Sequence, residues 1–430
     1  MPIPPFRPAR CRAAGTGPPR TARLNLPLAA ACVLVAAASA PASASETAPS
    51  MQAVFEQVGS MLDDLKDIMG FGPRRPVRLT SISKAEFRRL YQRRMKQEQD
   101  AREIRNEVTF LRLFGLVPED FDYEETVLDL LSEQAWALYD YKRRKMYLAD
   151  WAPPDAREFA LLHELVHAVD DQNFNLGAYV KGARESEQQL ARLAAMEGQA
   201  SWVMTEWVMR QSEKSLLNNR ILAITTASAT RFEAQQFPVY ESTPLYFREV
   251  LIFPYTDGLL FQHDMVERFG TDGFRRVFAQ PPETTQQILQ PDLYLRKVAP
   301  LPPKLPAAPL PKGYKRTYDG SFGQLDHRIL LEHHLGEDDR SDLLDQWSGA
   351  RFEVFESRRE RQAVLQYAVR WGSPEAAREY YHLYRQVCER KWEGLQLVDS
   401  GPDRCEGRSR SGQVILEVEG SVVRSSEGIP

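Results

Sequence analysis

The part of the chain best suited to chemistry is residues 161–172, which read LLHELVHAVDDQ. His163 and His167 stand four residues apart, so on a helix both imidazoles project from one face and can bind the same metal ion. Glu164 directly follows the first histidine, where it can accept a proton from a metal-bound water without being a ligand itself. The surrounding residues are mostly apolar, and burying two imidazoles and a carboxylate is costly unless they are paired or bind metal. The alternative is a pair of core histidines that are satisfied by hydrogen bonds.

A tetrahedral zinc site needs a third protein ligand and one open position for water. We expect Glu197 to be this ligand. On a helix, the residues one turn away from it are apolar or small, and a carboxylate on such a face needs a counter-charge. Gly198 and Ala200 would let this helix approach the histidine helix closely.

Other candidates for the third ligand are weaker. Glu185 and Glu187 lie in a polar stretch and are expected to face solvent. Glu206 neighbours two tryptophans, and an N–H group could satisfy its carboxylate. His263 is the remaining candidate, on a further helix.

Sequence patterns predict the elements that must carry these side chains. Residues 156–174 and 183–211 have helical periodicity, which places the two histidines on one helix and Glu197 on the next. In residues 135–151, apolar and polar side chains alternate on both sides of a basic turn, and this pattern predicts a β-hairpin. The other predicted elements are a strand at 77–82, a helix from a capping box at 83–86 to 114, a helix that begins after Pro254, a helix at 324–335, strands at 352–355 and 363–371, a helix at 374–392 and an alternating segment at 413–423.

Composition and charge exclude some classes of protein. The chain has 430 residues, of which 55 are Lys or Arg and 59 are Asp or Glu, so its net charge is −4. A nucleic-acid binder usually has a basic surface, so we expect no nucleic-acid partner.

Residues 1–44 have the three parts of a secretory signal peptide: a basic start, an apolar middle at 24–40 and small residues before a cleavage site. The alternative is a membrane anchor, which Pro27 and the short apolar run disfavour. Lipid attachment at Cys32 is a weaker alternative, because apolar residues continue on its C-terminal side. We therefore expect an extracytoplasmic protein, periplasmic or secreted, with no membrane span in the mature chain.

The signal peptide would be followed by three parts. Residues 45–298 form the main domain, 299–313 a Pro-rich extended linker and 314–430 a C-terminal region. Within the main domain, residues 45–75 are an inhibitory arm or, more simply, a disordered N-terminus. Cys388 and Cys405 form an even pair that could make a disulfide in an oxidising compartment, or they are two unrelated thiols.

The two helix motifs resemble the gluzincin class of zinc peptidases, to which thermolysin belongs. HELVHAVDDQNFNL at 163–176 and MEGQASWVM at 196–204 are more closely similar to a group of exported bacterial zinc peptidases. Weaker similarity to that group extends over residues 75–425. The connection between His167 and Glu197 is longer than in thermolysin-like enzymes.

The predicted elements and the resemblance together give an α+β fold class: a mainly helical, zincin-like catalytic domain with a small sheet or hairpin, followed by a small α+β C-terminal region or extension. The resemblance also implies that His163, His167 and Glu197 bind Zn²⁺ and that Glu164 is the general base. The substrate would be a peptide or protein, held in extended form by a hairpin strand at 145–150.

The sequence allows more than one role for the residues that would support the metal ligands. Asp171 could orient the ring of His167, or it is an ordinary surface residue. Tyr255, Tyr294 and His263 are candidates for oxyanion stabilisation, and no spacing rule selects among them.

Two other functions fit the same motifs. One is a catalytically inactive, zinc-stabilised binding or scaffold protein of the cell envelope. It is favoured by Gln290, because the similar group often has His at this place. The other is a zinc hydrolase that acts on non-peptide amides.

Overall fold

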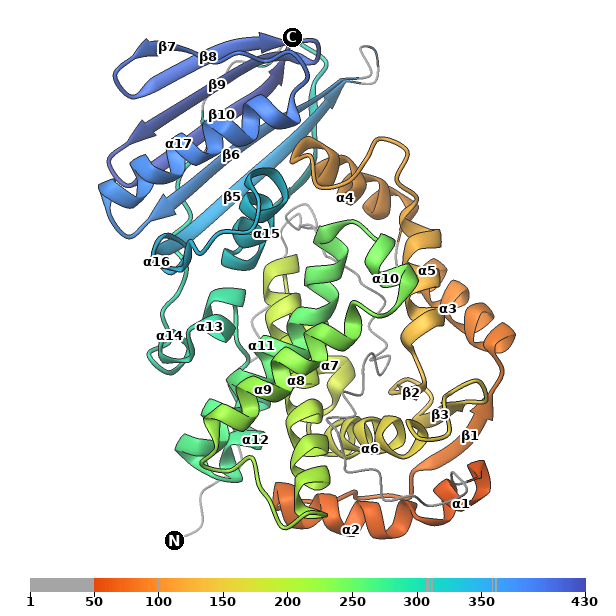
Figure 1. Cartoon of the computed structure of the whole chain (residues 1–430). Coiled ribbons are helices and arrows are strands. Elements are labelled where there is room, and N and C mark those ends of the chain that lie inside the picture. Colours follow the sequence, from red (N-terminus) through yellow and green to blue (C-terminus); the bar gives the residue numbers. More distant parts are fainter. Residues whose placement is uncertain (1–49, 99, 307–309, 311, 358, 360–361) are drawn as a thin grey trace, which may run out of the picture.

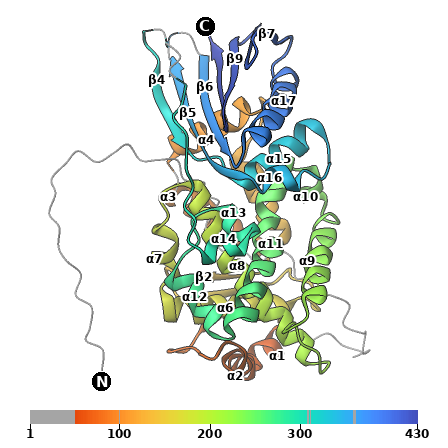
Figure 2. The same cartoon turned by 90° about the vertical axis from the view of Figure 1, so that its left-hand side faces the viewer.

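The computed structural model describes residues 50–430 except 99, 307–309, 311, 358 and 360–361. The predicted signal peptide and Cys32 lie outside these residues. An α+β fold is confirmed: a helical region with a three-stranded sheet is followed by a seven-stranded sheet that carries its own helices (Figures 1 and 2).

The two helices expected to carry the metal ligands are present. α6 (Arg157–Phe174) ends at Asn175, which has a left-handed backbone and caps the short α7 (Leu176–Lys181). α8 (Ser186–Arg210) follows and runs through the centre of the helical region (Figure 1).

The third long helix starts earlier than predicted. α11 (Leu245–Phe269) begins after Pro244 and contains Pro254 in its interior, so Pro254 does not open the helix. A proline removes one backbone hydrogen bond of a helix, but the residues on both sides of it, Phe253 and Tyr255, are buried. Burial of this apolar helix therefore outweighs the lost hydrogen bond.

The close approach expected of Gly198 takes place with a different helix. A Cβ atom on Gly198 would lie 2.1 Å from the carbonyl group of Gly258 in α11, and one on Gly258 would lie 2.2 Å from the carbonyl oxygen of Ala194. The expectation that Gly198 faces the histidine helix is wrong. It faces α11, and the opposite side of α8 is free to approach α6.

The segment expected to be disordered is helical in its described part. α1 (Met51–Glu56) and α2 (Val58–Met69) pack against α6 and α8. Leu65 is fully buried, and the indole N–H of Trp207 donates to Asp64 at 2.8 Å.

The predicted strand and hairpin join into one small sheet. β1 (Arg78–Ile82) pairs parallel with β3 (Lys145–Ala149), which pairs antiparallel with β2 (Ala137–Asp140). Because β3 is the middle strand, both of its edges are occupied. The expectation that residues 145–150 hold a substrate is therefore wrong, whereas β2 is an edge strand next to α6.

The helix predicted from the capping box to residue 114 is two helices. Glu86 accepts from Ser83 as the capping box requires and opens α3 (Lys84–Glu98). A new helix, α4 (Ala101–Leu113), starts where Asp100 caps the N–H of Arg102. The remaining helices of this region are α5 (Tyr123–Gln134), α9 (Arg220–Ala234), α10 (Pro238–Ser242), α12 (Asp272–Ala279), α13 (Thr285–Leu289) and α14 (Pro291–Leu295). Among all described helices, none is both long and apolar enough to cross a membrane.

The C-terminal region is built on an antiparallel sheet with strand order β4-β5-β6-β10-β9-β8-β7. Residues 301–306 lead into it without helix or strand, as a Pro-rich linker predicts. The segment predicted at 413–423 is two strands, because the chain turns at Gly420, whose φ is +55°. The strands are β4 (Lys315–Gly320), β5 (Trp347–Ser357), β6 (Gln362–Trp371), β7 (Val398–Gly401), β8 (Arg404–Ser409), β9 (Gly412–Glu419) and β10 (Val422–Ile429), and the helices are α15 (Gln324–Leu335), α16 (Ser341–Leu344) and α17 (Pro374–Lys391).

The helical and C-terminal regions share one hydrophobic core. Phe110 of α4 stacks on Phe352 of the sheet with ring centroids 4.2 Å apart, and Phe114 stacks on Phe322 at 4.5 Å. Burying aromatic rings against one another contributes strongly to stability. The C-terminal region is therefore packed against α4 and is more than an appended extension.

The two cysteines of the C-terminal region are free thiols in this structure. Cys388 lies on α17 and Cys405 on β8, and both are buried. Burial raises the pKa of both thiols, most strongly that of Cys388. They are therefore poor nucleophiles as they stand.

The contact between α8 and α11 predicts that Gly198→Ala is destabilising. The added methyl group would overlap backbone atoms of α11, so we expect the free energy of unfolding to fall by about 2 kcal/mol or more. Denaturant unfolding followed by circular dichroism measures this. Gly59→Ala on α2 is the control, because no atom lies within 4 Å of its added Cβ. It should be neutral or raise stability by up to about 1 kcal/mol. Equal effects of both changes would contradict the prediction.

Candidate metal centre

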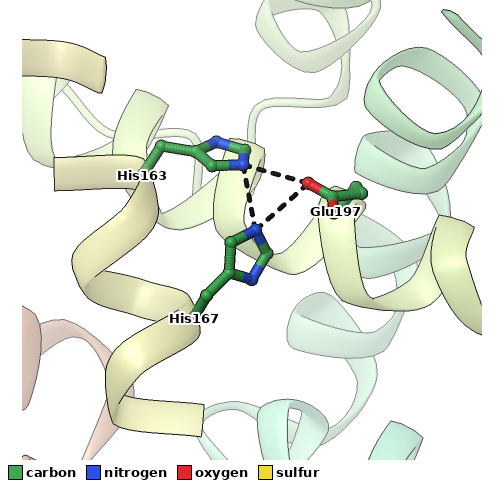
Figure 3. A group of neighbouring side chains, drawn as sticks. All are labelled: His163, His167 and Glu197. Atoms are coloured by element: carbon green, nitrogen blue, oxygen red, sulfur yellow. Dashed lines mark hydrogen bonds and ion pairs between the residues drawn. The ribbon is translucent and has the colours of Figure 1, made fainter. Parts of the chain in front are cut away.

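Three side chains from two helices bring their ligating atoms together (Figure 3). His163 and His167 lie one turn apart on α6, and Glu197 lies in the middle of α8. Each Nε2 atom of the histidines is 3.1 Å from Oε2 of Glu197, and the two Nε2 atoms are 3.2 Å apart. Within the described residues this is the only group of three such side chains whose ligand atoms lie within 4.8 Å of one another. The three predicted ligands therefore meet at one point.

The size of this triangle fits a tetrahedral metal ion. Atoms at about 2.0 Å from tetrahedral zinc lie about 3.3 Å from one another. Hydrogen bonds alone satisfy the group poorly, because both Nε2 atoms point at the same carboxylate oxygen and at each other. In the part of the chain that the structure describes, the buried Oε1 of Glu197 has no hydrogen-bond partner. Two imidazoles and one carboxylate are a donor set of catalytic zinc sites.

The protonation states of the three groups affect one another, because the groups are in contact and each is only 1% exposed. Burial lowers the pKa of an imidazole, and this dominates for His163. For His167 the carboxylate of Glu197 outweighs burial and raises the pKa to about 9. Burial likewise raises the pKa of a carboxyl group, but the charge of His167 holds the pKa of Glu197 at about 2. A proton on His167 thus balances Glu197, and a metal ion that binds there must displace this proton.

Glu164 lies beside the ligands and is not one of them. It is fully buried, and its Oε2 accepts the backbone N–H of Tyr139 at 2.6 Å. Tyr139 belongs to β2, so the edge strand of the small sheet holds the carboxylate in place. Its position outside the group of ligating atoms is the one expected of a base next to a metal-bound water.

The residue expected to orient His167 has another role. Asp171 accepts from the hydroxyl of Tyr139 at 3.0 Å and from the backbone N–H of Leu176, so it ties α6 to β2 and α7. The Nδ1 atom of His167 has no hydrogen-bond partner among the residues described here. Asp171 therefore does not fix this ring.

Sequence reasoning missed a second contact between the ligand helices. The side-chain amide of Gln199 donates to both oxygens of Asp170, at 2.9 and 3.0 Å. Both residues are fully buried, and burial raises the pKa of Asp170 well above its usual range. Helical spacing marks only one member of the pair: Asp170 follows His167 by three residues and shares its face, whereas Gln199 follows Glu197 by two and does not.

The other candidates for the third ligand are engaged elsewhere. Glu187 is buried and accepts from the backbone N–H and the hydroxyl of Thr285, so the expectation that it faces solvent is wrong. Glu206 is also buried, and it accepts from Ser215, Leu216 and Arg210. Glu185 is the partly exposed N-cap residue of α8.

Of the three candidates for oxyanion stabilisation, only Tyr255 lies beside the metal ligands. Its ring centroid is 6.0 Å from that of His163. The hydroxyl of Tyr294 donates to the carbonyl oxygen of Gln280 at 2.8 Å. His263 accepts from the indole N–H of Trp202 and pairs with Glu267.

Comparison of the chain with models of protein families, with curated proteins and with solved structures gives no match. The resemblance to gluzincins therefore rests on the two helix motifs.

The geometry predicts that the protein binds one zinc ion per chain and that Glu197→Gln and His163→Ala lose it. Each change removes one donor from the triangle, and metal content measured by plasma mass spectrometry should fall to near zero. Glu206→Gln is the matched control, since Glu206 is a buried carboxylate of the same helix with its own partners. Zinc retained in Glu197→Gln would contradict the proposed ligand set.

Proposed function

We propose that the protein is an exported, zinc-dependent metallopeptidase that hydrolyses peptide bonds with Glu164 as general base. One observation carries the proposal: two imidazoles and a carboxylate from α6 and α8 converge within 3.2 Å, with a further carboxylate directly beside them. The predicted signal peptide supports export to the periplasm or beyond.

In this mechanism, three residues would be metal ligands and a fourth would be the general base. His163, His167 and Glu197 would hold the zinc ion, which when bound acidifies a water molecule and polarises the scissile carbonyl. Glu164 would take the proton of that water and later deliver it to the leaving amine. The hydrogen bond that Glu164 accepts from the backbone N–H of Tyr139 keeps the carboxylate beside the site in the absence of substrate.

A peptide substrate would pair with β2. This strand forms one edge of the small sheet and contacts α6, whereas β3 is paired on both sides. An extended peptide that adds to a sheet edge gains main-chain hydrogen bonds and places its carbonyl groups in a row.

Glu164→Gln tests the role of the base. The amide has nearly the same shape but cannot accept a proton, so kcat for peptide cleavage should fall by about 10³-fold. Zinc content should stay that of the wild-type protein, because Glu164 lies outside the ligand group. The measurement is cleavage of a fluorogenic peptide library by zinc-loaded protein. Undiminished cleavage by the variant would exclude Glu164 as the base.

Tyr255→Phe tests the residue next to His163. If its hydroxyl stabilises the oxyanion, kcat should fall by about 10²-fold while KM and zinc content change little. Tyr294→Phe is the matched control, because the hydroxyl of Tyr294 is bonded to a backbone carbonyl. Equal losses in both variants would assign Tyr255 a structural role only.

A second function is favoured by the burial of the site. The three ligands are each 1% exposed and Glu164 is fully buried, and closed zinc sites typically stabilise a fold. The protein would then be a zinc-stabilised binding or scaffold protein of the cell envelope. In that case Glu164→Gln leaves its cellular role intact, whereas His163→Ala lowers its melting temperature and abolishes that role.

A further inference from the structure

One face of α9 is apolar and exposed to solvent. Of the eight large apolar side chains that are exposed in the described chain, four lie on this helix or in the loop directly before it. Ile221 is 79% exposed and Phe232 is 64% exposed, and Leu217 and Ile224 are each about half exposed. Figure 2 shows α9 at the right-hand edge of the helical region, where its other side packs on α11. Single exposed apolar residues are common, but a cluster of them marks an interaction site.

The exposed residues form a continuous stripe along α9. Ile221, Ile224, Ser228 and Phe232 follow one another at intervals of three or four residues, so their side chains lie on one face of the helix. We call these four residues the α9 stripe. Ser228 is small and lies between larger side chains, so a second helix can approach closely at this point. The stripe therefore has the form of a surface that packs against another helix.

The α9 stripe carries no charge, and neither does the exposed Thr225 beside it. The two arginines of α9 are already paired within the chain: Arg220 binds Asp264 at 2.8 Å, and Arg231 binds Glu249 at 2.6 Å. A helix that lies on a membrane surface typically has free basic residues beside its apolar face, which these arginines do not provide. An uncharged face can meet its own copy without placing like charges opposite each other.

The exposed apolar area fits a dimer of standard size. Each exposed large side chain can present on the order of 150 Å², so Leu217 and the three apolar residues of the stripe together present about 350 Å². Each partner of a standard interface buries about 800 Å², of which somewhat more than half is apolar. The four residues thus supply most of the apolar share. Exposed polar neighbours such as Asn218, Thr225 and Gln235 are available for the polar rim.

We propose that α9 is the interface of a homodimer, in which the α9 stripe of one chain packs against the same stripe of a second copy. Two-fold dimers that use one surface on both partners are the commonest symmetric assemblies. Pairing removes Ile221 and Phe232 from water, which is the main driving force for association. The interface is separate from the metal centre, because α9 packs on α11 and none of the three ligands lies on either helix.

Sedimentation velocity of the purified protein tests this interface. At about 10 µM the wild-type protein should sediment as a dimer. Ile221→Glu and Phe232→Glu should each raise the dissociation constant of the dimer at least about 100-fold, because a symmetric interface would bury two added carboxylates. Both side chains are exposed in the single chain, so circular dichroism should show that the two variants are folded.

Two controls separate this surface from other sites. Val398 is 67% exposed on β7 of the C-terminal sheet, so Val398→Glu adds the same charge elsewhere and should dimerise like the wild-type protein. Glu164→Gln should also dimerise, so the result does not depend on the proposed peptidase activity. A monomeric wild-type protein, or association unchanged in Ile221→Glu and Phe232→Glu, would overturn the proposal. A monomer that co-sediments with phosphatidylglycerol vesicles and is released by Phe232→Glu would assign the face to a membrane, and would overturn it as well.

Discussion

The packing of α6 against α8 is the constraint on which the candidate site depends. It places two imidazoles and one carboxylate within 3.2 Å of one another in a region closed to solvent. Such groups are costly to bury singly, and each is tolerated because the others are there. The proton on His167 and a metal ion are two ways to balance the same carboxylate. Folding is thus linked to the charge balance of one small cluster, which a metal ion would change if it bound there.

Each face of α8 has a different neighbour. Glu197 and Gln199 meet α6, where Gln199 binds Asp170 and sets the separation of the two helices. Gly198 on another face allows the backbone of α11 to approach closely. Near the start of the helix, Glu187 accepts from Thr285 beside the C-terminal region. A single helix therefore connects the candidate metal centre with the C-terminal region.

Sequence patterns predicted elements well where the local signals were strong. The hairpin, α6, α8, α15 and α17 lie within a few residues of their expected positions, because periodicity and capping residues agree there. Errors occurred where a local signal was overruled. Pro254 sits inside α11 because the helix is buried on both sides of it, and Asp100 starts a new helix inside a continuous helical pattern. Glu187 looked solvent-facing because its stretch is polar, but packing against the C-terminal region buries it.

The amino-acid sequence alone determined the identity of the metal-binding candidates. The four-residue spacing of His163 and His167 requires that both rings share a helix face, and the small apolar neighbours of Glu197 mark a carboxylate that needs a counter-charge. Only the tertiary structure decided which groups support them. In the structure, the backbone N–H of Tyr139 binds Glu164, Asp171 binds the hydroxyl of Tyr139 and does not orient His167, and β2 is the edge strand. The physical reason is that spacing along a helix is a local property, whereas contacts between elements depend on how distant segments pack.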